Sequence, residues 1–324
     1  MIRPSKIMKI LHVTYNPDWF KDHFDFLCQQ LGHEGETQQI SDMNDGEFDA
    51  VAANKRWAVH KHYYESFDAI FVSHLAHLSR IFLQNDWKKP LYIWLCFRFD
   101  FGAQDREFYR LIKEARNRPN VKFFAASEHD RLYIQRMLGD FPVEIVPPMV
   151  YVNSANKIKI PCDSNTFFVM SKHNETVFMN LKQELDTLGI PVYRHGWSDG
   201  PPDLRGVRGV IHIPYTFLTR TLYENLALGN VFFLADESFV RKNMWRAGFF
   251  WDLPFTSPDE ISLAEWYREE HRDLFIYFSG LDELKAISED PNLDRLIAYK
   301  KGNIAKFTVK HNEETLKKWG EIFS

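Results

Sequence analysis

Short apolar runs alternate with amphipathic segments along the first half of the chain. The runs of strand length are IMKILHV, ETQQISD, FDAIFV, LYIWLCF, NVKFFAAS and VEIV. Between them, apolar residues recur at helical spacing in residues 18–32, 106–118 and 128–139, and Gly32 and Gly139 are placed as helix C-caps. Strands that alternate with helices in this way predict βαβ units and a parallel sheet.

The same alternation restarts after Pro147 and Pro148, which predict a linker. The strands of this second series are NTFFVMS, IPVYRHGW, VRGVIHIP and NVFFLA, and its helices cover residues 175–189 and 218–228. From Ser257 onward the sequence predicts mainly polar helices, the last of them amphipathic.

Two such series predict an α/β protein with two Rossmann-like domains that face each other across a cleft. The first domain is expected to cover residues 1–150 and to bind an acceptor, and the second to cover residues 151–305 and to bind a donor. Residues 306–324 are expected to form a helix that packs back on the first domain. Parallel sheets bind ligands at the carboxyl ends of their strands, so the cleft is the expected site.

Composition narrows the class of protein. The 324 residues are 45% hydrophobic and 26% charged, which suits two separate cores. The net charge of -4 gives no global basic field of the kind that nucleic acids attract. Cys28, Cys96 and Cys162 lie far apart, which favours a reducing cytoplasm over a disulfide framework. We find no signal peptide and no apolar run long enough to span a bilayer, so no membrane span is expected.

The segment RTLYENLALGNVFFLADESF, residues 220–239, carries the sharpest chemical pattern. Arg220 and Glu224 form an i, i+4 pair beside the apolar stripe of a predicted helix. One interpretation is a surface salt bridge. The other is a ligand site, in which Glu224 accepts hydrogen bonds from a sugar diol and Arg220 meets a phosphate near the helix N-terminus. A helix that follows a parallel strand begins at the ligand-binding edge, which favours the second interpretation.

This segment resembles the donor-binding region of GT-B glycosyltransferases, in which a glutamate before Ala-x-Gly binds the ribose of a nucleotide sugar. Glu224, Ala227 and Gly229 match that pattern. Upstream, FFAASEHDRLYIQRMLG followed by VEIVPPM is similar to the end of a GT-B N-terminal domain. The resemblance implies a glycosyltransferase with a nucleotide sugar, expected to be a UDP-sugar, as co-substrate and with no tightly bound cofactor.

Two features refine this resemblance. Many retaining members carry a paired-glutamate motif whose first member would fall at Thr216, so its absence favours inversion.

The second half is also similar to phage β-glucosyltransferases that modify hydroxymethylated DNA bases. The acceptor is therefore expected to be such a base in duplex DNA, with a cell-surface or capsule glycan as the alternative. A phage-encoded enzyme would act in the host cytoplasm. A third possibility is a catalytically silent binding protein of the same fold.

The donor site is predicted to include loops at other strand ends. Lys172 and Asn174, in the loop MSKHNE, are expected near the diphosphate leaving group, although an exposed loop lysine would give the same pattern. Arg194 and Gly196 follow another strand. The full predicted donor set is Glu224, Arg220, Lys172, Thr221, Tyr223, Gly196, Asn174 and Arg194.

An inverting transferase needs a base that takes the proton from the acceptor hydroxyl. Asp100 follows a buried strand between Phe99 and Phe101 and is the predicted base, although aspartate in such a place is often a turn or capping residue. Asp105 is the rival candidate for the base, and His12, Asp18 and His74 are further candidates, each at a strand end or in the first loop. Acceptor contacts are predicted at Arg98, Asp105, His74 and Asp18.

Other chemistries lack support in the sequence. His60 with His62, and His74 with His77, have no third ligand nearby in the sequence, so no metal site is expected. The chain contains neither a P-loop nor a Gly-x-Gly-x-x-Gly motif, which removes the kinase and dehydrogenase interpretations.

Overall fold

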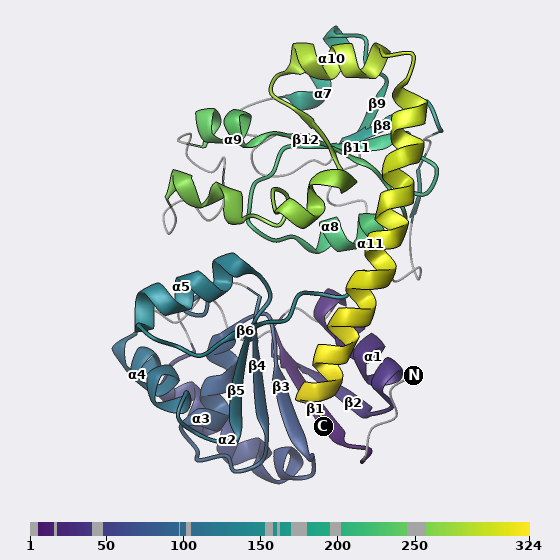
Figure 1. Cartoon of the computed structure of the whole chain (residues 1–324). Helices are drawn as coiled ribbons and strands as arrows, with labels where there is room; N and C mark the ends of the chain where they lie inside the picture. Colours follow the sequence, from purple (N-terminus) through teal and green to yellow (C-terminus); the bar gives the residue numbers. More distant parts are fainter. Residues whose placement is uncertain are drawn as a thin grey trace. The chain divides into compact units, whose positions relative to one another are not determined.

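The computed structural model in Figure 1 divides into two compact units, Met1–Met149 with Glu313–Ser324, and Val150–Asn312. It describes residues 6–15, 18–40, 48–96, 98–101, 105–152, 158–160, 163–169, 180–194, 202–244, 250 and 257–324. Each unit is an α/β structure built on a parallel sheet. The prediction of two parallel-sheet units is therefore confirmed.

The first unit contains a six-stranded sheet in the order β2-β1-β3-β4-β5-β6. Its strands are β1 (Lys9–Thr14), β2 (Glu34–Gln39), β3 (Ala69–Val72), β4 (Leu91–Leu95), β5 (Val121–Ala125) and β6 (Glu144–Ile145). All of these pairs are parallel. Every residue of β3 and β4 is buried, which explains their uninterrupted apolar sequence.

Helices and 3-10 turns connect these strands. One of these helices, over residues 50–65, was not predicted from the sequence. The connecting elements are α1 (Asp18–Leu31), α2 (Ala50–Glu65), η1 (Ala76–Ser79), α3 (Arg80–Leu83), α4 (Arg106–Ala115) and α5 (Glu128–Leu138). Helix α2 buries Ala53 and Tyr64 but leaves Val51 and Val59 exposed, so its sequence has no clear apolar stripe. The Asp49 side chain caps its N-terminus.

The last helix of the chain, α11 (Leu293–Ile322), ends in the first unit. Trp319 is fully buried and packs edge-on against Trp94 and Phe71, with ring centroids 5.5 Å apart in both pairs. Phe323 lies 5.2 Å from Tyr92. The C-terminal residues thus belong to the core of the first unit.

The second unit contains a five-stranded parallel sheet in the order β13-β12-β11-β8-β9, and a two-stranded sheet of β10 and β7. The strands are β7 (Ile158–Lys159), β8 (Phe167–Val169), β9 (Val192–Arg194), β10 (Pro202–Asp203), β11 (Gly209–His212), β12 (Phe232–Ala235) and β13 (Ile276–Phe278). Strand β13 lies in the part expected to be helical. It has only three residues, too few to show a period.

The helical elements of the second unit are α7 (Leu181–Thr187), α8 (Arg220–Ala227), α9 (Glu237–Asn243), η4 (Pro258–Leu263), η5 (Glu269–Leu274), α10 (Leu281–Glu289) and the first part of α11. In both sheets the first strand along the chain lies between its two successors, β1 between β2 and β3, and β8 between β9 and β11. The chain reverses its winding direction there, and open α/β sheets bind ligands beside the carboxyl ends of the strands at this point. No helix among the described residues is long and apolar enough to cross a membrane.

Candidate functional site

Helix α8 begins at the carboxyl edge of the second sheet. Strand β11 ends at His212, and the chain then passes through residues 213–219 into the helix. The Thr219 side chain accepts a hydrogen bond from the Leu222 backbone N–H at 3.3 Å and caps the helix. The N-terminal amide groups of α8 therefore lie at the edge where parallel sheets bind anionic ligands.

Arg220 and Glu224 form the ion pair that their spacing predicts. The Arg220 Nη2 and Glu224 Oε1 atoms are 2.7 Å apart, and the two side chains are 34% and 13% exposed. The guanidinium thus remains accessible to an anion while it holds the carboxylate in place. Both side chains lie in the first turns of α8, close to its capped end. Donor binding by this pair stays a prediction.

The other predicted donor residues are placed in different surroundings. Tyr223 is 1% exposed and its hydroxyl donates to Glu265 Oε2 at 3.2 Å, so its side chain belongs to the core instead of contacting a ligand directly. Thr221 is half-buried on α8, and Arg194 is the half-buried last residue of β9. Lys172, Asn174 and Gly196 lie outside the described residues.

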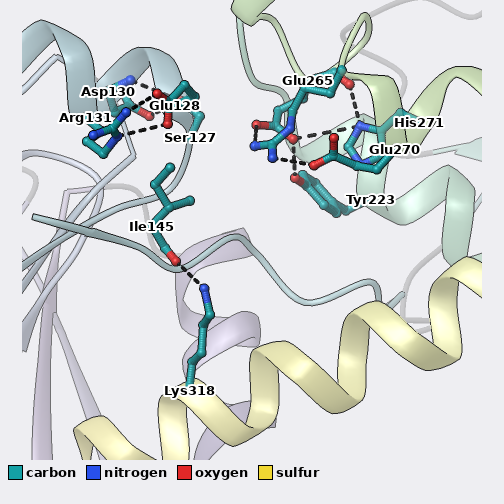
Figure 2. A network of polar contacts seen from close by, with 11 residues as sticks. Ser127, Glu128, Asp130, Arg131, Ile145, Tyr223, Glu265, Glu270, His271 and Lys318 are labelled. Carbon is teal, nitrogen blue, oxygen red and sulfur yellow. Dashed lines mark hydrogen bonds and ion pairs between the residues drawn. The ribbon is translucent and has the colours of Figure 1, made fainter.

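A buried polar cluster beside α8 was not predicted (Figure 2). The Glu265 carboxylate accepts hydrogen bonds from Tyr223 and from Arg268 Nη1, the latter at 3.3 Å. The His271 Nδ1 atom lies 2.5 Å from the Glu265 backbone oxygen, and Arg268 also pairs with Glu270. Burial raises the pKa of Glu265, which Arg268 opposes, and it lowers the pKa of His271. The sequence offers one clue to this cluster, a lone glutamate between Ala264 and Trp266.

In the first unit, Asp100 lies in a closed polar pocket after β4. It is 1% exposed and accepts hydrogen bonds from Tyr109 and Tyr133, the latter at 3.0 Å. The Arg98 Nη1 atom lies 3.7 Å from its Oδ1 atom. Burial raises the pKa of both tyrosines and the carboxylate adds to this, so both phenols remain protonated donors. Two phenols and a guanidinium thus surround the Asp100 carboxyl group, and its role as a base stays a prediction.

Three predicted acceptor residues lie near this pocket or at helix starts. The Arg98 guanidinium lies 5.8 Å from the rings of both Phe101 and Tyr133. Asp105 accepts a hydrogen bond from the Phe108 backbone at 2.8 Å, and its two oxygens accept hydrogen bonds from buried Arg80 at 2.7 and 2.8 Å. These contacts give Asp105 a structural role in starting α4. Asp18 is the first residue of α1.

His74 lies at the end of β3, beside the point where the first sheet reverses its winding. Its φ of 69° and the 2.9 Å hydrogen bond from Leu75 N–H to the Ser73 carbonyl define a γ-turn with positive φ, the rare and strained form of this turn. The imidazole stacks on Phe20 at 4.6 Å. Burial, with a contribution from His77, lowers the pKa of His74 to about 4, so the ring is neutral at neutral pH. Strain of this kind gathers at functional sites.

A second set of polar contacts, at the carboxyl end of β5 in the first sheet, was also not predicted. The Ser127 hydroxyl donates to Asp130 Oδ2 at 2.6 Å and accepts from the Asp130 backbone at 3.2 Å, which caps α5 at the end of β5 (Figure 2). Glu128 and Arg131 pair on the same turn. In the described part of the chain, no three His, Cys, Asp or Glu side chains are grouped so that they could hold a metal ion.

Comparison with solved structures identifies the fold. The chain is similar to the glycotransferase of kitacinnamycin, with a TM-score of 0.51 and 10% identity over 96% of this chain and 98% of that chain. TarM gives a TM-score of 0.49 at 11% identity, over 79% of this chain and 54% of TarM, so the chain spans about half of that protein. SnogD from Streptomyces nogalater gives 0.39 at 11% identity, over 93% and 95% of the two chains.

No protein-family model matches the sequence, and no curated protein matches it either. The fold is nevertheless clear, since two parallel-sheet units and the first of these structural similarities define a glycosyltransferase fold of GT-B type. The closer resemblance to phage DNA glucosyltransferases stays a prediction.

Proposed function

We propose that this protein is a glycosyltransferase that moves a sugar from a nucleotide sugar, with a UDP-sugar as the first candidate, to an acceptor hydroxyl. The observation that carries the proposal is the Arg220–Glu224 pair in the first turns of α8, at the carboxyl edge of the second sheet of a GT-B fold. Glu224 would accept hydrogen bonds from the ribose hydroxyls. Arg220 and the α8 amides would face the diphosphate.

In the reaction, the acceptor oxygen forms a bond to the anomeric carbon of the sugar as the bond from that carbon to the phosphate oxygen breaks. The acceptor proton passes to a base, and the nucleoside diphosphate leaves with the bonding electron pair. Arg220 and the helix N-terminus would stabilise its negative charge. We propose inversion because Thr216 offers no carboxylate at the position where many retaining members carry their first glutamate.

The base is proposed to come from the first unit. Asp100 is the first candidate, because two phenols and an arginine fix its carboxyl group in position. Since Asp100 is only 1% exposed, this role requires that the side chains around it move aside when the acceptor binds. His74 is the alternative, because its ring is neutral at neutral pH and can accept a proton. The two differ in one testable respect, since loss of the true base abolishes transfer but leaves donor binding intact.

A donor screen tests the proposed function. UDP-, GDP- and ADP-sugars are added at millimolar concentration while the thermal unfolding of the protein is followed, and a bound donor raises the unfolding temperature. The donor found is then offered with hydroxymethylated duplex DNA and with glycan acceptors, and product is detected by mass spectrometry. We expect one nucleotide class to stabilise the protein and one acceptor class to receive sugar. A protein that no nucleotide sugar stabilises and that transfers to neither acceptor would contradict the proposal.

Salt dependence separates the two acceptors. A DNA acceptor requires contacts to phosphates, so affinity for duplex DNA must fall steeply with salt. Absence of measurable affinity at low salt would leave the glycan as acceptor.

A further inference from the structure

Helix α8 is too short to hold its own position. It has eight residues, about two turns, and helices of this length are unstable without tertiary contacts. Its C-terminal end is held by the side chains of Asn225 and Asn230, whose amides are 2.9 Å apart, and by the Asn230 N–H donating to the Asn225 carbonyl at 2.9 Å. The contacts that hold its N-terminal half, where Arg220 and Glu224 lie, are made by another segment.

The loop of residues 264–268 supplies those contacts. The Glu265 N–H donates to the Phe217 carbonyl at 2.9 Å, two residues before the helix cap. The Glu265 carboxylate accepts the Tyr223 hydroxyl at the end of the first turn (Figure 2). Glu265 thus contacts both the backbone that leads into α8, at Phe217, and the side chain of Tyr223, the residue before Glu224.

This loop is itself fixed to the carboxyl edge of the sheet. Tyr267 donates its hydroxyl to the carbonyl of Ala235, the last residue of β12, at 2.8 Å. Tyr277 of β13 donates to the Trp266 carbonyl at 2.7 Å. A displacement of Tyr223 relative to Glu265 is therefore a displacement of α8 relative to the sheet.

The Glu265 side chain is 2% exposed, and burying a carboxylate carries a large desolvation penalty. The charged and titratable groups around it are Arg268, Glu270 and His271 on its own segment and Tyr223 on α8. The His311 ring of α11 lies 5.7 Å from the other partner, Tyr223. A buried polar residue of this kind fixes one arrangement of its neighbours, because each alternative leaves a buried group without its hydrogen bond.

We propose that Glu265 is the positioning residue of the donor site. Its carboxylate holds Tyr223 and its backbone N–H holds the Phe217 carbonyl, and these contacts fix the N-terminal half of α8 and with it Arg220 and Glu224. The proposal rests on the proposed function. Glu265 touches no substrate itself, and its effect on the donor passes through α8.

Four single variants, and the double variant that combines Tyr223→Phe with Glu265→Ala, test the proposal. Tyr223→Phe removes the hydroxyl, Glu265→Ala removes the acceptor, and Glu265→Gln keeps an oxygen that can accept the Tyr223 hydroxyl. The control is Tyr63→Phe in the first unit, which removes a similar tyrosine–glutamate hydrogen bond, from Tyr63 to Glu36 at 2.6 Å. Each is measured by hydrogen–deuterium exchange of residues 218–229 and by calorimetric titration with UDP.

We expect Tyr223→Phe and Glu265→Ala to speed exchange in α8 and to weaken UDP binding, each about tenfold, as the loss of one buried hydrogen bond predicts. The double variant should be no worse than Glu265→Ala alone, because the Tyr223 hydroxyl acts through the Glu265 carboxylate. Glu265→Gln should restore most of both properties, and Tyr63→Phe should change neither.

The two readouts separate this proposal from the proposed function. If the wild-type protein binds neither UDP nor any other nucleotide, the proposed function fails, and exchange in α8 still decides whether Glu265 fixes the helix. Unchanged exchange in α8 would overturn the proposal. Faster exchange with unchanged UDP affinity would also overturn it, because Glu265 would then hold the fold without positioning the donor site.

Discussion

Replacing Glu224 by glutamine distinguishes a salt bridge from a ligand site. If the Arg220–Glu224 pair only links two helical residues, its loss should cost about 0.3–0.5 kcal/mol of unfolding free energy, because Arg220 is one-third exposed and water screens the pair. If Glu224 also accepts hydrogen bonds from the ribose hydroxyls, each bond to the charged carboxylate contributes about 1.5–3 kcal/mol. Donor affinity should then fall by about 10- to 150-fold.

Stability and affinity must therefore be measured on the same variant. Urea denaturation gives the free energy of unfolding, and calorimetric titration with the nucleotide sugar from the donor screen gives the dissociation constant. Asp186→Asn is the matched control, because it breaks the i, i+4 ion pair of Asp186 with Lys182 on helix α7 of the same unit. We expect a small stability loss in both variants and a loss of donor affinity in Glu224→Gln alone. Unchanged donor affinity in Glu224→Gln, with the wild-type protein binding normally, would refute the assignment.

Three further predictions concern the first unit. Asp100→Asn keeps the shape and the phenol contacts but removes the base, so transfer should fall more than about 100-fold at unchanged donor affinity; steady-state rates equal to wild type would transfer the role to His74. Trp319→Ala should cost about 3–5 kcal/mol in urea denaturation, and a loss below about 1 kcal/mol would contradict the packing described for the C-terminal helix. Burial lowers the pKa of His23 from 6.5 to about 3, so the unfolded chain binds the proton first and stability falls as the pH drops below 6.5, by about 3 kcal/mol at pH 4. His23→Gln should flatten that acid slope, and an unchanged slope would show that other groups cause it.

The sequence predicts most strands of the two large sheets, because most buried parallel strands are short, continuous apolar runs. Residues 91–95, for example, are apolar throughout and buried throughout. The same reasoning misses two elements. The exposed valines of α2 obscure its helical period, and β13 has too few residues to show a period. Amphipathic pattern is visible only where one face of an element is buried and the other is not.

The candidate site is less predictable because its contacts join distant parts of the chain. Glu224 follows from its place after a parallel strand, and its partner Arg220 follows from helical spacing. The partner of Tyr223 is Glu265, 42 residues away, and no spacing in a single sequence reveals it. Asp100 and Asp105 illustrate the same limit. They look alike in sequence, but one lies in a pocket of phenols and the other starts a helix and binds Arg80.

The return of α11 to the first unit has a consequence for biosynthesis. The core around Trp94 and Phe71 includes Trp319, which lies after the whole second unit in the sequence. Domains are generally completed in the order in which they emerge, the N-terminal one first. Here the core of the unit that is translated first is filled only after residues 150–312 have also been translated. All residues of the segment from Val150 to Asn312 are therefore available before the first unit can complete its core.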